Sequence, residues 1–135
     1  STLRGVRVRT SEIPSLIDEL PILMVAACFA SGSTVLEGVE ELKVKETDRI
    51  HSMLSNLSRM KASISLKRIK GKLSIVIRGT GKLRGAHLNS FNDHRTAMSM
   101  IIASLRANTP SVLDQSECID KSFPTFFEVL KQVSA

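Results

Sequence analysis

Residues 45–77, KETDRIHSMLSNLSRMKASISLKRIKGKLSIVI, contain the pattern that decides the fold class. The first half spaces apolar residues at i, i+3, i+4, i+7 and i+10, which predicts an amphipathic helix over residues 45–60. The apolar positions are Ile50, Met53, Leu54, Leu57 and Met60. The second half alternates apolar and polar residues in two runs, 62–66 and 73–77, on either side of a connection that contains glycine. This alternation is typical of an antiparallel hairpin, so a helix followed by two paired strands forms the middle of the chain.

Shorter patterns on both sides of this stretch complete an alternating order of strands and helices. The expected strands cover residues 3–8, 33–38, 86–89 and 111–114. The expected helices cover residues 16–30, the stretch from Asn92 or Asp93 to just before Pro110, and a last stretch from about Ser122. The order is β-α-β-α-β-β followed by β-α-β-α, which predicts a mixed α/β (α+β) fold.

This order is an internal repeat. The equivalent residues in the two copies are Asp18 and Asp93, and Lys45 and Lys121. Residues 1–80 then form a complete βαβαββ unit, and residues 81–135 form a second unit that lacks its closing hairpin. Because this length holds one domain or a piece of one, and an unfinished unit leaves a sheet edge unpaired, we expect residues 1–135 to be part of one domain of a longer protein.

The composition excludes several classes of protein. With 42% hydrophobic and 24% charged residues in 135, the chain resembles an ordinary globular protein and not a disordered or fibrous one. Its longest apolar run, residues 22–30, is too short to cross a membrane, so no membrane partner is expected. Cys28 and Cys118 lack the paired spacing of a zinc or redox site. We therefore expect inert thiols, a reducing compartment and a cytoplasmic protein.

The net charge of +6 is divided unevenly along the chain. Residues 49–92 contain ten Lys or Arg and no Asp or Glu, whereas the other 91 residues, with nine basic and thirteen acidic residues, carry −4. One interpretation is a basic βαββ module that binds nucleic acid. The stretch offers only Phe91 for stacking on single-stranded bases, which makes this the weaker alternative, and no nucleic-acid partner is expected.

Four cations lie where helices are expected to begin. They are Lys45, Arg49, Arg95 and Lys121. Helix N-termini carry partial positive charge, so cations there are unfavourable unless an anion binds among them. Two alternatives need no ligand: Lys45 and Arg49, four positions apart beside Glu46, can form a surface ion-pair cluster, and Asp93 can be a plain N-cap.

Three ordered motifs carry a specific resemblance. They are KETDR at residues 45–49, NDHRTAM at residues 92–98 and CIDKSFP at residues 118–124. Together they resemble the C-terminal domain of the enolpyruvylshikimate-phosphate (EPSP) synthase family, with similarity from about residue 13 to residue 131. The resemblance implies an inside-out α/β barrel domain of repeated βαβαββ units, incomplete in this chain, whose helix N-termini face a cleft to an N-terminal domain of the same polypeptide.

The resemblance also implies an activity. The family transfers the enolpyruvyl (carboxyvinyl) group of phosphoenolpyruvate to the 5-hydroxyl of shikimate 3-phosphate and releases phosphate, in aromatic amino-acid synthesis. It implies no metal and no other cofactor, a monomeric parent protein, and no turnover by this chain alone. By position it assigns Asp18 as the base that contacts the shikimate hydroxyl, Glu46 as the proton donor to the methylene carbon, Lys45 as a contact to shikimate 3-phosphate, and Arg49, Arg95 and Lys121 as contacts to phosphoenolpyruvate.

These residue types suit that chemistry. One group must take the hydroxyl proton and another must exchange a proton with the methylene carbon, which two carboxylates can do. Phosphoenolpyruvate carries a carboxylate and a phosphate, and both match the planar fork of an arginine. The sequence therefore predicts an anion-binding active site at the helix N-termini.

Overall fold

A computed structural model of the chain describes residues 3–119 and Lys131. The helix expected from about residue 122, and Lys121 just before it, lie outside these residues. The strands are β1 (Arg7–Val8), β2 (Ser33–Glu37), β3 (Ser63–Ile69), β4 (Lys72–Arg78), β5 (His87–Asn89) and β6 (Val112–Asp114). The α-helices are α1 (Ile13–Leu16), α2 (Leu20–Phe29), α3 (Arg49–Arg59) and α4 (His94–Arg106), and the 3₁₀ helices are η1 (Thr10–Glu12), η2 (Ile17–Glu19) and η3 (Glu40–Val44).

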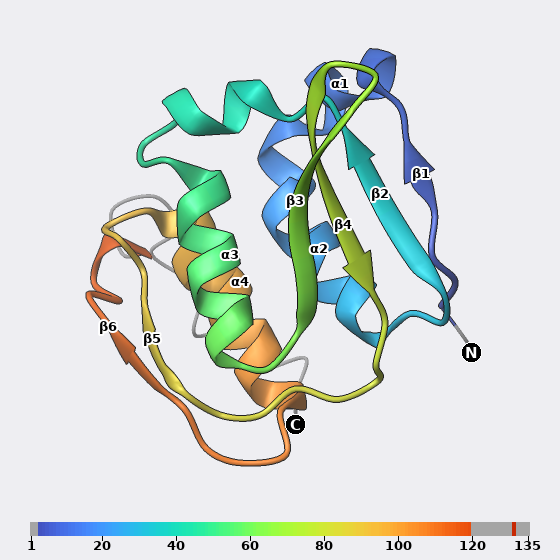
Figure 1. Cartoon of the computed structure of the whole chain (residues 1–135). Helices are drawn as coiled ribbons and strands as arrows, with labels where there is room; N and C mark the ends of the chain where they lie inside the picture. Colours follow the sequence, from blue (N-terminus) through green and yellow to red (C-terminus); the bar gives the residue numbers. More distant parts are fainter. Residues whose placement is uncertain (1–2, 120–130, 132–135) are drawn as a thin grey trace.

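Four strands form one sheet in the order β1-β2-β4-β3 (Figure 1). β1 is parallel to β2, and β4 is antiparallel to both β2 and β3. The expected hairpin is confirmed, but its strands are longer than predicted and its turn is shorter. Lys70 and Gly71 have φ of 53° and 77°, the left-handed pair that a two-residue hairpin turn requires, so the pairing continues to Ile69 and Lys72.

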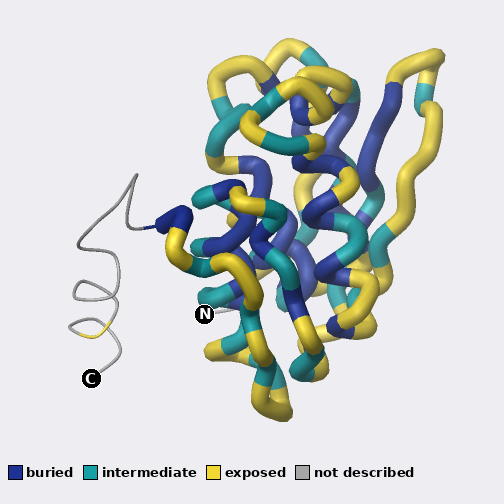
Figure 2. The backbone as a smooth tube through the Cα atoms, turned by 90° about the vertical axis from the view of Figure 1, so that its left-hand side faces the viewer, coloured by how far each residue is buried: buried dark blue, intermediate teal, exposed yellow. Residues whose placement is uncertain are grey.

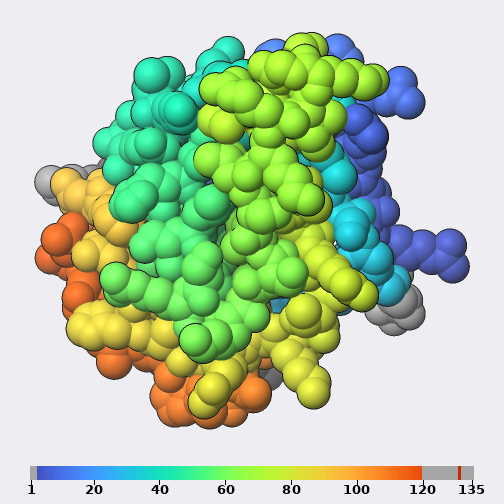
Figure 3. All heavy atoms as spheres, in the orientation of Figure 1, coloured from blue at the N-terminus to red at the C-terminus, as the bar shows by residue number. Residues whose placement is uncertain are grey.

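Helices α2 and α3 pack on one face of this sheet, and α4 packs against both helices (Figure 1). Between the layers lies a continuous apolar core. Figure 2 shows the buried residues as dark segments of the backbone. It includes Met24 of α2, Leu36 of β2, Leu57 of α3, and Ile75 and Ile77 of β4, all fully buried. The space-filling view in Figure 3 shows the β3–β4 hairpin and α3 covering the front of the molecule.

The second half of the described chain forms a smaller parallel pair. β5 and β6 are joined through α4, as a parallel connection requires. Asn56 of α3 donates from Nδ2 to the carbonyl of Asn89 over 2.7 Å and accepts from its N–H over 2.9 Å, so α3 is fastened to β5. The mixed α/β class is confirmed, whereas the division into a unit at 1–80 and an unfinished unit at 81–135 stays a prediction.

Two helices begin later than their apolar patterns predict. The stretch 16–30 is divided into the end of α1, η2 and α2, because Pro21 lacks the N–H that a continuous helix needs and favours a helix start instead. The helix expected from residue 45 begins at Arg49, where the Asp48 carboxylate caps it by accepting from the N–H of His51 over 3.1 Å. α2, α3 and α4 all begin at the same end of the molecule (Figure 1).

Candidate active site

The site at this end is built around the guanidinium of Arg49, the first residue of α3. Its side chain is 1% exposed and donates to three carboxylates. Nε and Nη2 donate to the two oxygens of Asp93 over 2.9 and 3.0 Å. Nη1 donates to Asp18 over 3.1 Å, and Nη2 donates also to Glu46 over 2.6 Å. One buried cation therefore joins η2, the approach to α3 and the start of α4.

Asp93 is the most enclosed of these carboxylates, with a side chain that is 0% exposed. It is the N-cap of α4 and accepts from the N–H groups of Arg95 and Thr96 over 3.4 and 3.2 Å. The Thr96 hydroxyl donates to it over 2.8 Å and shares a further hydrogen bond of 2.8 Å with the hydroxyl of Ser52 on α3. The N-cap alternative for Asp93 is thus confirmed, and the same carboxylate also binds Arg49.

Burial and pairing act in opposite directions on the Arg49–Asp93 pair. Burial by itself raises the pKa of the Asp93 carboxyl, but hydrogen bonds from Arg49 and Thr96 outweigh it and hold that pKa below its ordinary value. For Arg49, burial disfavours the charged form, yet the contacts to Asp93, Glu46 and Asp18 leave its pKa raised. Both groups are therefore charged at neutral pH.

The two carboxylates to which the family resemblance assigns proton transfer are the more exposed partners of Arg49. Asp18, in η2, has a side chain that is 48% exposed, and that of Glu46, between η3 and α3, is 54% exposed. The structure thus brings Asp18 and Glu46 together on Arg49, with both carboxylates accessible to solvent. Because Arg49 is buried, the alternative of a surface ion-pair cluster does not describe this group.

Arg95 lies in the first turn of α4, half-buried, and lines a cavity of about 200 Å³ between α2 and α4. Asp18 lines the same cavity from η2. The other lining residues are Glu19, Ile22, Met98, Ser99 and Ile102. A cation and a candidate base thus share a small pocket beside Arg49.

Two predicted site residues, Lys45 and Lys121, are not among the contacts of Arg49 described above. Lys45 lies before α3 in extended backbone, so the expectation that it shares a helix face with Arg49 is wrong. The cause is the Asp48 cap, which starts the helix four residues later than expected. Lys121 lies outside the described residues. The roles of all these residues toward substrates stay predictions.

Sequence reasoning missed the second function of Asp93 and the contributions of Ser52 and Thr96. A signal was available in the repeat, which aligns Asp18 with Asp93. The structure shows one guanidinium bridging these two equivalent carboxylates.

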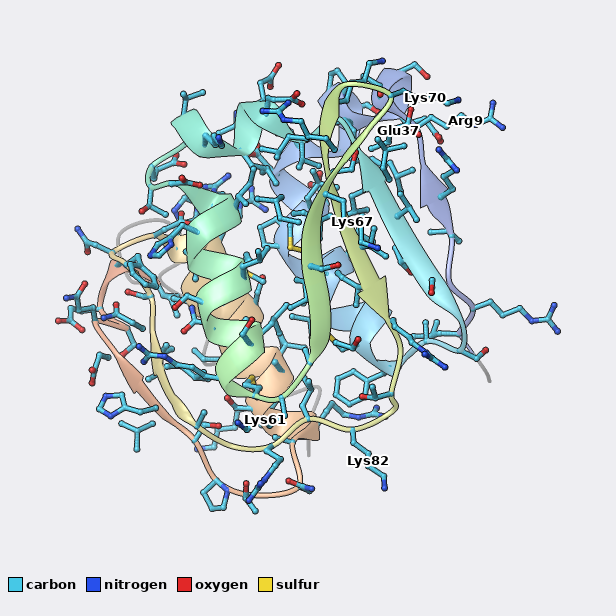
Figure 4. The ribbon with its side chains drawn as sticks, in the orientation of Figure 1. Arg9, Glu37, Lys61, Lys67, Lys70 and Lys82 are labelled. Atoms are coloured by element: carbon cyan, nitrogen blue, oxygen red, sulfur yellow. The ribbon has the colours of Figure 1, made fainter. Side chains whose placement is uncertain are left out.

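The labelled lysines of the basic stretch, residues 49–92, are spread over the length of the molecule (Figure 4). Lys61 and Lys82 lie at one end of the molecule, whereas Lys70 lies at the opposite end beside Arg9. Phe91, the aromatic residue that bases would stack on, packs edge-on against His51 at 5.4 Å between ring centroids. This dispersal gives the nucleic-acid alternative no structural support.

Among residues 3–119 and Lys131, no group of three or more His, Cys, Asp or Glu side chains is arranged to hold a metal ion. Within the same part of the chain, no helix is both long enough and apolar enough to span a bilayer.

Residues 1–130 match the family described as EPSP synthase (3-phosphoshikimate 1-carboxyvinyltransferase). The chain belongs to the EPSP synthase family. Curated EPSP synthases agree with this over almost the whole chain. The 3-phosphoshikimate 1-carboxyvinyltransferase of Geobacter sulfurreducens is 42% identical over 134 residues, 99% of this chain and 30% of that protein. The protein of the same name from Synechococcus elongatus is 46% identical over 133 residues, 98% of this chain and 29% of its own length.

Solved structures show the same fold. An EPSP synthase from Acinetobacter baumannii superposes with a TM-score of 0.87 at 38% identity, over 97% of this chain and 30% of that structure. The enolpyruvyl transferase NikO from Streptomyces tendae superposes with a TM-score of 0.72 at 16% identity, over 100% of this chain and 29% of its own, a likeness of fold alone. The chain thus spans about 30% of the length of the EPSP synthases that it matches.

Proposed function

We propose that this chain forms the phosphoenolpyruvate-binding side of the active site of a longer 3-phosphoshikimate 1-carboxyvinyltransferase. The observation that carries the proposal is the Arg49 cluster, in which Asp18 and Glu46 lie half-exposed on one buried guanidinium beside the Arg95 cavity. Family membership supplies the reaction class. The biosynthetic activity favours a cytoplasmic location, and we expect a monomeric parent protein.

In the proposed reaction, the 5-hydroxyl oxygen of shikimate 3-phosphate forms a bond to C2 of phosphoenolpyruvate. Asp18 takes the hydroxyl proton and Glu46 gives a proton to C3, so C2 becomes tetrahedral. C3 then returns a proton as the C2–O bond to phosphate breaks, which restores the double bond and releases phosphate. Arg49, Arg95, Lys45 and Lys121 would stabilise the anionic substrates, and the N-terminal domain of the parent would complete the site.

The test is a chimera in which this chain replaces the matching 134-residue segment of the Geobacter sulfurreducens relative. We expect phosphate release that requires both phosphoenolpyruvate and shikimate 3-phosphate. Asp18→Asn and Glu46→Gln should each lower kcat at least about 100-fold, the usual range for loss of a proton-transfer group.

Asp114→Asn is the control, because Asp114 is also half-exposed and hydrogen-bonded through its side chain, to His87 over 2.6 Å, but belongs to β6. Its kcat should stay within twofold of the parent chimera. A folded chimera without phosphate release would refute the proposed function. Equal losses in all three variants would show that the carboxylates of the cluster have no special role.

A further inference from the structure

Asp93 occupies the edge of Arg49 that the substrate would otherwise use. An arginine binds a carboxylate best through two parallel N–H groups, and here Nε and Nη2 already bind both oxygens of Asp93. The remaining contacts, from Nη1 and from Nη2 at its other hydrogen, point to Asp18 and Glu46. Asp93 thus binds the guanidinium along one edge. Its outer nitrogens, Nη1 and Nη2, face the half-exposed carboxylates of Asp18 and Glu46.

Asp93 is itself fixed by its surroundings. Its oxygens accept from Arg49, from the Thr96 hydroxyl and from two backbone N–H groups at the start of α4, and Ser52 holds the Thr96 hydroxyl from α3. Arg95 is the second residue of the helix that this carboxylate caps. One buried side chain therefore sets where Arg49 and Arg95 lie relative to each other.

We propose that Asp93 is a positioning residue for substrate binding, which holds the outer N–H groups of Arg49 toward Asp18 and Glu46 and sets the start of the helix that carries Arg95. The proposal rests on the proposed function. An anionic substrate then meets the outer nitrogens of Arg49 and displaces Glu46 or Asp18 from them. The displaced carboxylate is released beside the substrate, where its proton-transfer role requires it.

Simple electrostatics gives the opposite expectation, which makes the proposal testable. A negative charge close to an anion site repels the ligand, so removing it should tighten binding. If Asp93 acts by positioning, removing its charge weakens binding, because Arg49 is no longer held. The direction of change in the phosphoenolpyruvate KM therefore decides between the two.

The first measurement uses the chimera with Asp93→Asn, which keeps the size of the side chain and an oxygen for the N-cap. We expect the KM for phosphoenolpyruvate to rise at least tenfold while the KM for shikimate 3-phosphate changes less than twofold. Thr96→Val keeps its volume but loses the hydroxyl, and should raise the phosphoenolpyruvate KM about threefold. Asp48→Asn is the matched control, since Asp48 caps α3 from an exposed position, and should change neither KM by more than twofold.

The second measurement needs no activity and uses the 135-residue chain labelled with ¹⁵N-arginine. The Arg49 Nε–H should be protected from exchange with water, and Asp93→Asn should speed that exchange at least tenfold while Asp48→Asn leaves it unchanged.

An unprotected Arg49 Nε–H, or an unchanged or lower phosphoenolpyruvate KM in folded Asp93→Asn, overturns the proposal. If Asp93→Asn does not fold, an unchanged KM in Thr96→Val does so. An inactive parent chimera refutes the proposed function, while the exchange measurement still decides how Arg49 is held.

Discussion

At the scale of single residues, the unusual feature is a fully buried arginine beside a fully buried carboxylate. Desolvating two charges costs several kcal/mol per ion, and the interior recovers this only when the geometry is good and every polar atom is paired. Arg49 and Asp93 meet that condition through a two-point contact and through Thr96. Because its favourable contacts mainly offset this desolvation cost, the pair contributes a fixed side-chain geometry more than net stability.

Arg95 gives the prediction that belongs to this scale. In the chimera, Arg95→Lys should raise the KM for phosphoenolpyruvate more than tenfold, because lysine keeps the charge but cannot offer two parallel N–H groups. Steady-state phosphate release measures this. Arg106→Lys, at the last residue of the same helix and 5.4 Å from the ring of Phe29, is the control and should leave the KM within twofold. An unchanged KM in Arg95→Lys would show that the cavity beside α4 does not bind this substrate.

At the scale of helices and strands, the sequence predicted which elements exist better than where they begin. The apolar spacing around Met53 and Leu57 predicts a helix in any context, because it depends only on residues within that helix. Its start depends on Asp48, and that of α2 on Pro21, which act through single backbone groups. The convergence of Asp18 and Asp93 on Arg49 could be predicted only in part, since the repeat aligns the two carboxylates but does not show what lies between them.

The connection after β4 gives a prediction at this scale. The N–H groups of Thr80 and Gly81 donate to the carbonyl of Cys28 over 3.0 and 3.1 Å, which satisfies the last turn of α2. Gly79 lies so close to the end of α2 that a Cβ added to it would overlap the main-chain oxygen of Ala30. Gly79→Ala should therefore lower the free energy of unfolding of the 135-residue chain by about 3 kcal/mol, as backbone overlap forces both segments apart.

Urea unfolding measures this difference. The control is Gly71→Ala, where φ is 77° but no atom lies within 4 Å of the added Cβ. It should cost about 1–2 kcal/mol, the price of a left-handed residue with a side chain. A Gly79→Ala effect no larger than that of Gly71→Ala would mean that α2 and the connection are not packed as closely as the structure has them.

The contact between β1 and β2 predicts a dependence of stability on pH. Arg7 donates to Glu37 over 2.6 and 3.1 Å and Thr10 donates over 3.3 Å, and the hydrogen bonds from Arg7 hold the pKa of the Glu37 carboxyl below its ordinary value. A carboxyl group whose pKa is lower in the folded than in the unfolded state stabilises the folded state at pH values above the unfolded-state pKa, which is about 4.3 for Glu. This stabilisation is lost as the pH falls through the pKa of the folded state. Between pH 6 and pH 3.5, the 135-residue chain should lose more stability than Glu37→Gln does.

Urea unfolding at the two pH values tests this, with Glu41→Gln as the control. Glu41 is exposed in η3, so its replacement should leave the loss between pH 6 and pH 3.5 as large as in the parent chain. If Glu37→Gln shows the same loss as the parent chain, the Arg7 contact does not hold the carboxylate in solution.

At the scale of the whole molecule, the two arginines of the site, Arg49 and Arg95, lie in the first turns of helices that begin on the same side of it. α2, α3 and α4 begin at a single end, and the described carboxylates and arginines of the site lie there. The chain spans about 30% of the length of the EPSP synthases that it matches, and an addition between two anionic substrates needs groups around both. Substrate binding is therefore expected to be shared with the rest of a longer polypeptide.

This sharing predicts that the 135-residue chain alone does not turn over phosphoenolpyruvate and shikimate 3-phosphate. Arg49 and Arg95 can meet one face of a substrate, but nothing in the described residues closes over the other face to exclude water, which the electrostatic contribution to catalysis requires. Phosphate release should stay at the level of the protein-free blank, at concentrations where the chimera gives a linear rate. Release above the blank that Asp18→Asn abolishes would contradict the prediction, because it would place a complete site within this chain.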